Sequence, residues 1–182
     1  SARLARAVAG DRRLKASGIT ASMVLIETTY ATASILIPTT IARLKPDAVL
    51  MFGVASKRRA LSIETRAKNR VSILHPDAAG VFPSRLWPFP DAPFVARGRA
   101  PFAQLVVAGR RAGVKTRASI SAGSYLCNDS YWRMLAATGP QTPCVFLHIP
   151  KVRGRAMMAR LTEAGVQAAL MLVKAARTVP TS

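Results

Sequence analysis

Acidic residues are scarce in this sequence, and so are the residue types that bind metals or form disulfides. The chain contains 8 Asp plus Glu, 2 His and 2 Cys. A metal site needs three or four ligands at suitable spacing, and the two histidines and Cys127 and Cys144 do not offer one. We therefore expect no metal. The absence of a CxxC pair also argues against a disulfide-stabilised secreted protein and favours a reducing compartment, the cytoplasm.

Long hydrophobic runs are missing as well. The uninterrupted apolar stretches, such as 48–52 and 144–147, have the length of a strand and fall far below the roughly 20 residues of a membrane span. Residues 1–8 lack the apolar run of roughly 7 to 15 residues that a secretory signal requires. We therefore predict no transmembrane helix, no membrane partner and no export. The chain opens without Met, in the pattern of an amphipathic helix, so we expect N-terminal sequence to be missing.

The motifs of several enzyme classes are also absent. There is no G-x-S-x-G elbow, no Walker loop and no G-x-G-x-x-G after a strand. Serine hydrolases, nucleotide hydrolases and dinucleotide-binding enzymes therefore lack their signatures here. Thiol chemistry is the main catalytic option that remains.

Positive charge is abundant: 27 Lys plus Arg against 8 acidic residues give a net charge of +19. Such a charge attracts polyanions at low salt. The basic residues are scattered from Arg3 to Arg177, without a recognition-helix motif or a basic run interleaved with aromatics. We expect nucleic acid to bind only non-specifically. A nucleic-acid-binding function stays as an alternative, which a contiguous basic patch would favour.

The apolar pattern predicts an α/β protein with one domain over residues 1–182. Continuous apolar runs are typical of strands buried on both faces, which requires helices on either side of the sheet. Between 76 and 101, six prolines and two glycines predict a surface loop. The predicted strands are 22–26, 47–52, 116–119 and 144–149, and the predicted helices are 32–44, 102–112, 123–137 and 156–177.

Three residues are candidates for catalysis. Cys127 lies in the first turns of a predicted helix, where the macrodipole is expected to lower the thiol pKa. His148 ends an apolar strand, where catalytic side chains of α/β proteins often emerge. On spacing alone, a buried apolar cysteine and a satisfied core histidine are the more common interpretations. The local sequence around Glu64 indicates a solvated carboxylate that is paired with Arg66 or Lys68.

Four segments together resemble the pyroglutamyl peptidase I family of cysteine peptidases. They are 45–55 (KPDAVLMFGVA), 62–64 (SIE), 121–128 (SAGSYLCN) and 146–150 (FLHIP), in the order and spacing of that family. The resemblance implies a three-layer α/β/α fold with a mixed, mostly parallel central sheet. In this chain the sheet would lack the family's N-terminal strand and the Gly/Phe/Pro-rich loop that follows it.

The resemblance also implies an activity and its residues. Cys127 would be the nucleophile, His148 its base and Glu64 the group that orients the base, in removal of an N-terminal pyroglutamyl residue from peptides without a cofactor. The other positions implied around the substrate and the oxyanion are Gly53, Val54, Tyr125 and Leu126. Cys144 matches no functional position, which indicates a core residue. A homo-dimer or tetramer is implied as well.

Two departures from the family pattern favour an alternative, a protein of the same fold with weak or redirected amide or acyl hydrolysis. The first is the missing N-terminal segment. The second is Leu74, which occupies the position of a family Arg near the reacting carbonyl, although His75 or Arg70 could substitute. The turn 56–59 (SKRR) replaces a Gly-rich turn and places extra positive charge near Glu64.

Overall fold

A computed structural model describes residues 1–178 of the chain. Three helices are followed by four strands, and helices and strands alternate from there on. The strands form a four-stranded sheet and a small two-stranded sheet. The helices are α1 (Ala2–Ala9), α2 (Arg12–Ala16), α3 (Tyr30–Leu44), α4 (Phe102–Arg111), α5 (Leu126–Ala137) and α6 (Gly154–Arg177). The strands are β1 (Val49–Val54), β2 (Leu61–Glu64), β3 (Arg66–Lys68), β4 (Val95–Arg97), β5 (Thr116–Ser119) and β6 (Cys144–Ile149).

The central sheet has the order β1-β6-β2-β5 and is mixed. The pairs β1·β6 and β2·β5 are parallel, and the pair β2·β6 is antiparallel. In register, Gly53 of β1 pairs with His148 of β6, and His148 pairs with Ser62 of β2. The mostly parallel, mixed sheet expected from the resemblance is confirmed, and β1 is an edge strand within the described residues.

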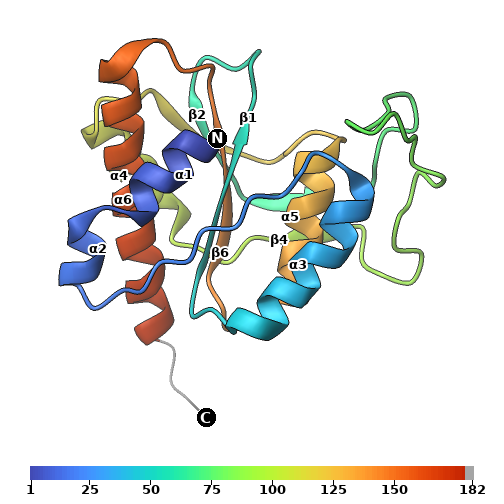
Figure 1. The fold of residues 1–182 in the computed structure, drawn as a ribbon, viewed down its shortest axis with the longest axis horizontal. Helices are drawn as coiled ribbons and strands as arrows, with labels where there is room; N and C mark the ends of the chain where they lie inside the picture. Colours follow the sequence, from blue (N-terminus) through green and yellow to red (C-terminus); the bar gives the residue numbers. More distant parts are fainter. Residues whose placement is uncertain (179–182) are drawn as a thin grey trace.

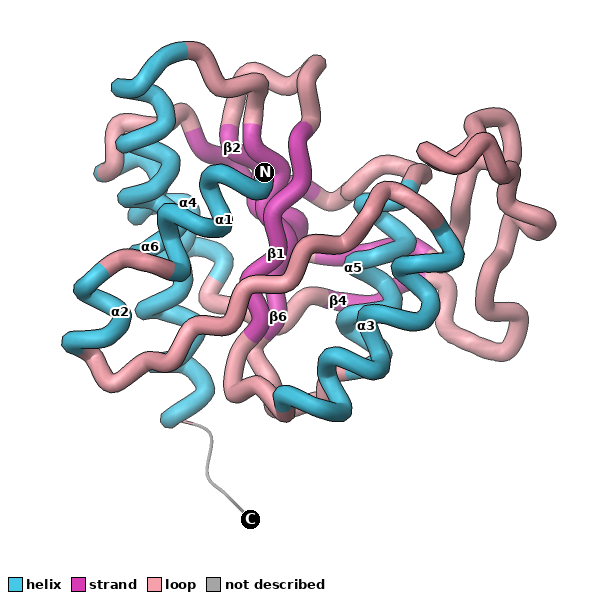
Figure 2. Tube along the Cα trace, viewed as in Figure 1, coloured by secondary structure: helices cyan, strands magenta, loops and turns pink. Residues whose placement is uncertain are grey.

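Helices cover both faces of this sheet, which confirms the three layers. In Figure 1, α1, α2, α4 and α6 lie on one side of the strands, and α3 and α5 lie on the other. The magenta strands of Figure 2 run between these two groups of cyan helices. The segment between β3 and β4, largely irregular in structure, extends away from the sheet beyond α3 and α5.

Two apolar clusters hold the layers together, one on each side of the sheet. Leu147 and Ile149 of β6 belong to the cluster under α1, α4 and α6, whereas Cys144 and Phe146 belong to the cluster under α3 and α5. Because successive side chains of a strand point to opposite faces, β6 is buried along its whole length. This explains why its sequence is a continuous apolar run, and it confirms Cys144 as a core residue.

Helix α6 is 24 residues long and is apolar enough to span a membrane by length and composition. No other helix within residues 1–178 meets these criteria. Its apolar stripe packs against the rest of the protein instead, since Leu161, Val166 and Leu172 are buried in the cluster shared with α1, α4 and the sheet. The helix therefore packs one face against the core of the protein.

Most predicted elements agree with the structure, and the strands 116–119 and 144–149 agree at both ends. The predicted strand 22–26 is wrong. This segment is extended but pairs with no strand in the described chain, and Val24 and Leu25 are 38% and 53% exposed. A β-branched apolar run predicts an extended backbone, but a strand also needs a partner for its hydrogen bonds.

Candidate active site

Glu64 and His148 lie side by side on the neighbouring strands β2 and β6. The Glu64 side chain is fully buried, and His148 is 4% exposed. The Oε1 atom of Glu64 lies 2.8 Å from Nδ1 of His148. A carboxylate only accepts hydrogen bonds, so Nδ1 carries the proton and donates it, which leaves Nε2 free to act as a base. The alternative interpretation of Glu64 as a solvated partner of Arg66 or Lys68 is wrong.

Cys127 reaches the same place from the start of α5. A Cβ atom on Gly53 would lie 3.0 Å from the Cys127 Sγ atom and 2.6 Å from the Phe146 ring, so the thiol sits directly over this glycine. Gly53 is paired in register with His148. The rings of Phe146 and His148, two residues apart on β6, are 4.8 Å apart. Both therefore project from the sheet face on which the thiol lies.

These contacts arrange the three candidate residues in one row across the sheet. The thiol stands over β1, the imidazole rises from β6 and the carboxylate comes from β2, and these strands are consecutive neighbours. Adjacent strands lie about 4.8 Å apart, so side chains on the same face of neighbouring strands are close enough to contact each other. Residues far apart in the sequence are thus brought together by the sheet order.

Burial is the main influence on the pKa of the Cys127 thiol. The pKa of Cys127 is raised, first by burial and second by the negative charge of Glu64, and the positive charge of Arg58 lowers it in part. The expectation of a thiol acidified by the helix macrodipole is therefore wrong. With its pKa raised in this way, the Cys127 thiol is protonated at neutral pH unless a neighbouring group takes its proton.

The start of α5 offers backbone N–H groups next to the thiol. Tyr125 is the N-cap residue, and its carbonyl oxygen accepts from the N–H groups of Asn128 and Asp129. Since the first N–H groups of a helix have no partner within it, those of Leu126 and Cys127 are available to an oxyanion. The Leu126 side chain itself is 3% exposed and packs in the core, so only its backbone can meet a substrate.

The remaining predicted substrate positions surround the thiol in different ways. Gly53 is buried beneath it, and Val54, the last residue of β1, is 48% exposed. Tyr125 is half-buried, and its hydroxyl group donates to the carbonyl oxygen of Pro76 at 2.8 Å. Its ring makes an edge contact with Tyr30, with centroids 6.2 Å apart.

Three polar residues that the sequence did not single out brace this site. The guanidinium of Arg58 donates to Oε1 of Glu64 at 2.5 Å. The Tyr131 hydroxyl donates to the Glu64 carbonyl oxygen at 3.0 Å. The Asn128 amide is fully buried and bonds both the N–H and the carbonyl group of Lys68, at 2.8 and 2.7 Å. No role was assigned to them from the sequence, although Asn128 ends the 121–128 motif and Arg58 belongs to the charged 56–59 turn.

The loop after β3 borders the start of α5. The N–H group of Ser72 donates to the carbonyl oxygen of Ser124 at 2.6 Å. Leu74, in the position of the family Arg, lies in this loop and is 77% exposed, and His75 and Arg70 are exposed as well. The loop thus places residue 74 at the rim of the site, with an apolar side chain in solvent.

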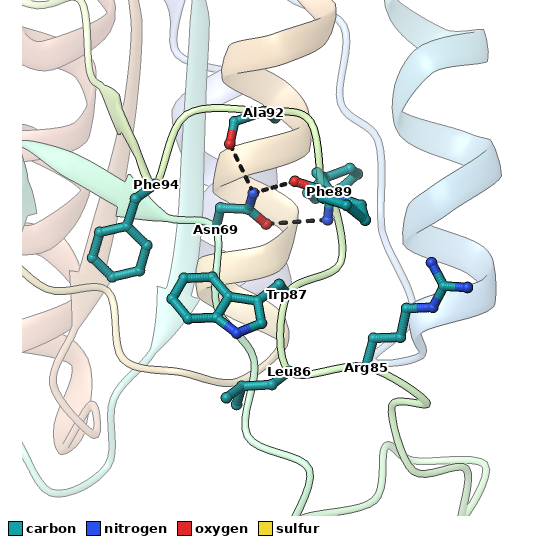
Figure 3. A pocket seen from close by; sticks show the side chains of 8 residues that line it. Asn69, Arg85, Leu86, Trp87, Phe89, Ala92 and Phe94 are labelled. Carbon is teal, nitrogen blue, oxygen red and sulfur yellow. Dashed lines mark hydrogen bonds between the residues drawn. The ribbon is translucent and has the colours of Figure 1, made fainter.

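A separate cavity of about 640 Å³ lies within the proline-rich loop. Figure 3 shows Trp87 and Phe94 side by side at its wall, and Asn69 bonded to the backbone of Phe89 and Ala92. None of the candidate catalytic residues lines it. Within residues 1–178, no group of three His, Cys, Asp or Glu side chains is placed to hold a metal ion.

Comparison with known proteins gives a consistent result. The model of the family described as "Pyroglutamyl peptidase" matches residues 2–179. The chain belongs to the pyroglutamyl peptidase family. Its relatives in this family include the pyrrolidone-carboxylate peptidases of Thermococcus onnurineus, 31% identical over 67% of this chain, and of Gloeobacter violaceus, 30% identical over 77% of it. The resemblance found in the sequence is confirmed.

Solved structures of pyrrolidone carboxyl peptidases share the fold. The enzyme from Thermus thermophilus superposes with a TM-score of 0.68 at 29% identity, over 79% of this chain and 80% of that one. A mutant from Pyrococcus furiosus superposes with a TM-score of 0.81 at 21% identity, over 92% and 88% of the two chains. In sequence, however, the match spans only 62% of the Thermococcus onnurineus protein and 68% of the Gloeobacter violaceus protein.

Proposed function

We propose that this protein is a cysteine peptidase that removes an N-terminal pyroglutamyl residue from peptides. The observation that supports this best is the row of Cys127, His148 and Glu64 across three neighbouring strands of a pyroglutamyl peptidase fold. A nucleophile, a base and a group that orients the base are the parts that thiol acyl transfer requires.

In the first half of the reaction, Nε2 of His148 takes the thiol proton, and the Cys127 thiolate attacks the carbonyl carbon of the pyroglutamyl residue. The oxyanion that forms would accept hydrogen bonds from the free N–H groups at the start of α5. The carbon–nitrogen bond then breaks as the imidazolium returns its proton to the departing amine. Glu64 keeps the imidazole in the required tautomer and stabilises its cation.

In the second half, water takes the place of the amine. Nε2 removes a proton from the water as its oxygen attacks the thioester carbonyl, and the tetrahedral intermediate expels the thiolate, which recovers a proton from the imidazolium. The products are free pyroglutamate and the regenerated thiol. No step needs a group that the chain does not carry, since proton transfers and the hydrogen bonds at the helix start supply the chemistry.

Release of a fluorogenic amine from a pyroglutamyl substrate tests this proposal. The protein should turn the substrate over in the presence of a reducing agent, and Cys127→Ala should abolish turnover. Cys144→Ala is the matched control, since Cys144 is a buried core residue and its replacement should leave kcat unchanged. Equal activity in the protein and in its Cys127→Ala variant would refute the proposal.

A second candidate is hydrolysis of another amide or acyl substrate by the same row of residues. The exposed Leu74 favours it, because an apolar side chain at the rim cannot stabilise charge near the reacting carbonyl. Losing one such donor typically costs about 10²- to 10³-fold in rate. A folded protein whose Cys127 reacts with alkylating agents, yet which releases no amine from pyroglutamyl substrates, would favour this alternative.

The setting in which the enzyme acts is part of the proposal. Both cysteines are free thiols, which is consistent with a cytoplasmic location. Peptides would be its substrates, and a homo-dimer or tetramer its assembly. Nucleic acid would bind only through net charge, in which case its affinity should fall steeply with salt and be independent of sequence.

A further inference from the structure

The Glu64 carboxylate has two cationic or proton-donating partners, and both use the same oxygen atom. His148 and Arg58 both bond Oε1, at 2.8 and 2.5 Å. The other oxygen, Oε2, is buried and has no partner among the described residues. The position of the carboxylate is therefore set jointly by the imidazole and the guanidinium, and a change in one partner alters the hydrogen bond to the other.

Arg58 makes a second attachment, to the chain that leads into the cysteine helix. Its NH2 group donates to the carbonyl oxygen of Ser121 at 2.7 Å. Ser121 lies between the end of β5 and the start of α5, six residues before Cys127. The Arg58 side chain is 21% exposed, so it is held within the protein rather than extended into water.

The turn that carries Arg58 is itself fixed to the sheet. The N–H group of Ala55 donates to the carbonyl oxygen of Ile149, which continues the β1·β6 ladder by one bond, and the N–H group of Arg58 donates to the carbonyl oxygen of Ala55. The guanidinium is thus supplied from a turn that is anchored to the strand of His148. A planar fork with several donors can bond two acceptors at once, which an ammonium cannot do in the same geometry.

We propose that Arg58 is a positioning residue of this site, which holds the Glu64 carboxylate against His148 and ties it to the segment that carries Cys127. This proposal rests on the function proposed above in one respect: turnover of a pyroglutamyl substrate is one of its two readouts. It adds a fourth member to the row, placed beyond Glu64 and acting through it.

The charges around the thiol agree with this role. The charges that act on it are the Glu64 carboxylate from β2 and the guanidinium of Arg58 from the β1–β2 turn. The titratable imidazole of His148 belongs to β6, in register with Gly53 beneath the thiol. Glu64 raises the pKa of Cys127 and Arg58 lowers it. Arg58 therefore offsets part of the effect that an orienting carboxylate has on its own nucleophile.

Three variants test the proposal. Arg58→Met removes the charge and both attachments, Arg58→Lys keeps the charge but cannot bridge, and Arg59→Met is the matched control, because this neighbour is exposed and its loss changes the net charge equally. The readouts are kcat on a pyroglutamyl substrate and the pH midpoint of Cys127 alkylation by iodoacetamide, with the label located by mass spectrometry.

For Arg58→Met we expect kcat to fall by about 10- to 100-fold, as for other residues that orient a catalytic group. The alkylation midpoint should rise by about one pH unit, since a nearby positive charge is lost. Arg58→Lys should keep the midpoint and lose kcat. Arg59→Met should change neither.

Two results would overturn the proposal. One is Arg58→Met with the kcat and midpoint of Arg59→Met, and the other is Arg58→Lys with unchanged kcat. If Arg58→Met does not fold, the folded Arg58→Lys variant decides by its kcat alone. If the unmodified protein releases no amine but the midpoint still shifts in Arg58→Met, the proposed substrate is wrong and the role of Arg58 stands.

Discussion

Side chains alternate between the two faces of the central sheet, and the faces differ in what they bury. Under α1, α4 and α6 the strands present Ile63, Leu147 and Ile149, all apolar. Under α3 and α5 the same strands present Glu64 and His148 beside Phe146. Both faces pack against an apolar cluster, but only the second also holds the polar groups of the candidate site, whose burial costs free energy unless they are paired. A shift of one residue along a strand therefore separates a position that only packs from one that is proposed to act in the reaction.

The sharpest way to test this separation is to change neighbouring residues of β6. His148→Gln should lower kcat by about 10⁴- to 10⁶-fold, the loss seen when a base of a catalytic triad is removed. Leu147→Ala should lower the free energy of unfolding by about 2–5 kcal/mol, because it leaves a cavity in the core. Turnover and urea denaturation check both variants. The proposed difference between the two faces would be contradicted if His148→Gln unfolded while Leu147→Ala stayed folded and lost turnover.

A smaller effect is expected at Gly53, where the polar face approaches α5 most closely. In Gly53→Ala the new methyl group would lie 2.6 Å from the buried Phe146 ring and 3.0 Å from the Cys127 thiol, so one of them must move. A displacement of about 1 Å at a catalytic group can cost about 10²-fold in rate. Gly139→Ala is the control, since its nearest neighbour would be Thr142 Oγ1 at 3.9 Å. Equal kcat in both variants would contradict the packing described.

The smallest effect concerns a brace of the polar face that takes no part in the chemistry. Tyr131→Phe removes the hydrogen bond to the Glu64 carbonyl oxygen and should cost about 1 kcal/mol of stability. The kcat value should stay close to that of the unmodified protein, because the carboxylate keeps its partners. Thermal unfolding and turnover measure the two quantities. A large loss of kcat with unchanged stability would assign the hydroxyl to the reaction itself.

The sequence predicted those elements of the fold whose burial is evident from their local composition. Strand β6 is apolar apart from His148 and bounded by Pro143 and Pro150, and both its ends agree with the structure. Strand β2 has only four residues, two of them polar, and its pattern gives no local signal for a strand buried on both faces. The extended segment 22–26 has strand composition, but whether a partner strand is available is a property of the whole fold.

The same limit applies to the site. The roles proposed for Cys127, His148 and Glu64 come from the resemblance, since a single cysteine, histidine or glutamate has little local signal of its role. The contact of Glu64 with Arg58 depends on a turn that folds back over β2 and β5, and the sequence indicated only added charge there. Burial of the thiol raises its pKa. The extent of this burial depends on how α5 packs against the sheet, which cannot be predicted from the apolar pattern of the helix.

We predict that the Cys127 thiol depends on the His148 imidazole for its reactivity at neutral pH, and the pH profile of Cys127 alkylation tests this dependence. Burial raises the pKa of the thiol, so the unassisted group should react only at alkaline pH. In the unmodified protein, iodoacetamide should label Cys127 at neutral pH and leave Cys144 unlabelled. In His148→Ala the neutral-pH reaction should disappear and return only as the pH rises. Identical profiles in the two proteins would contradict the account.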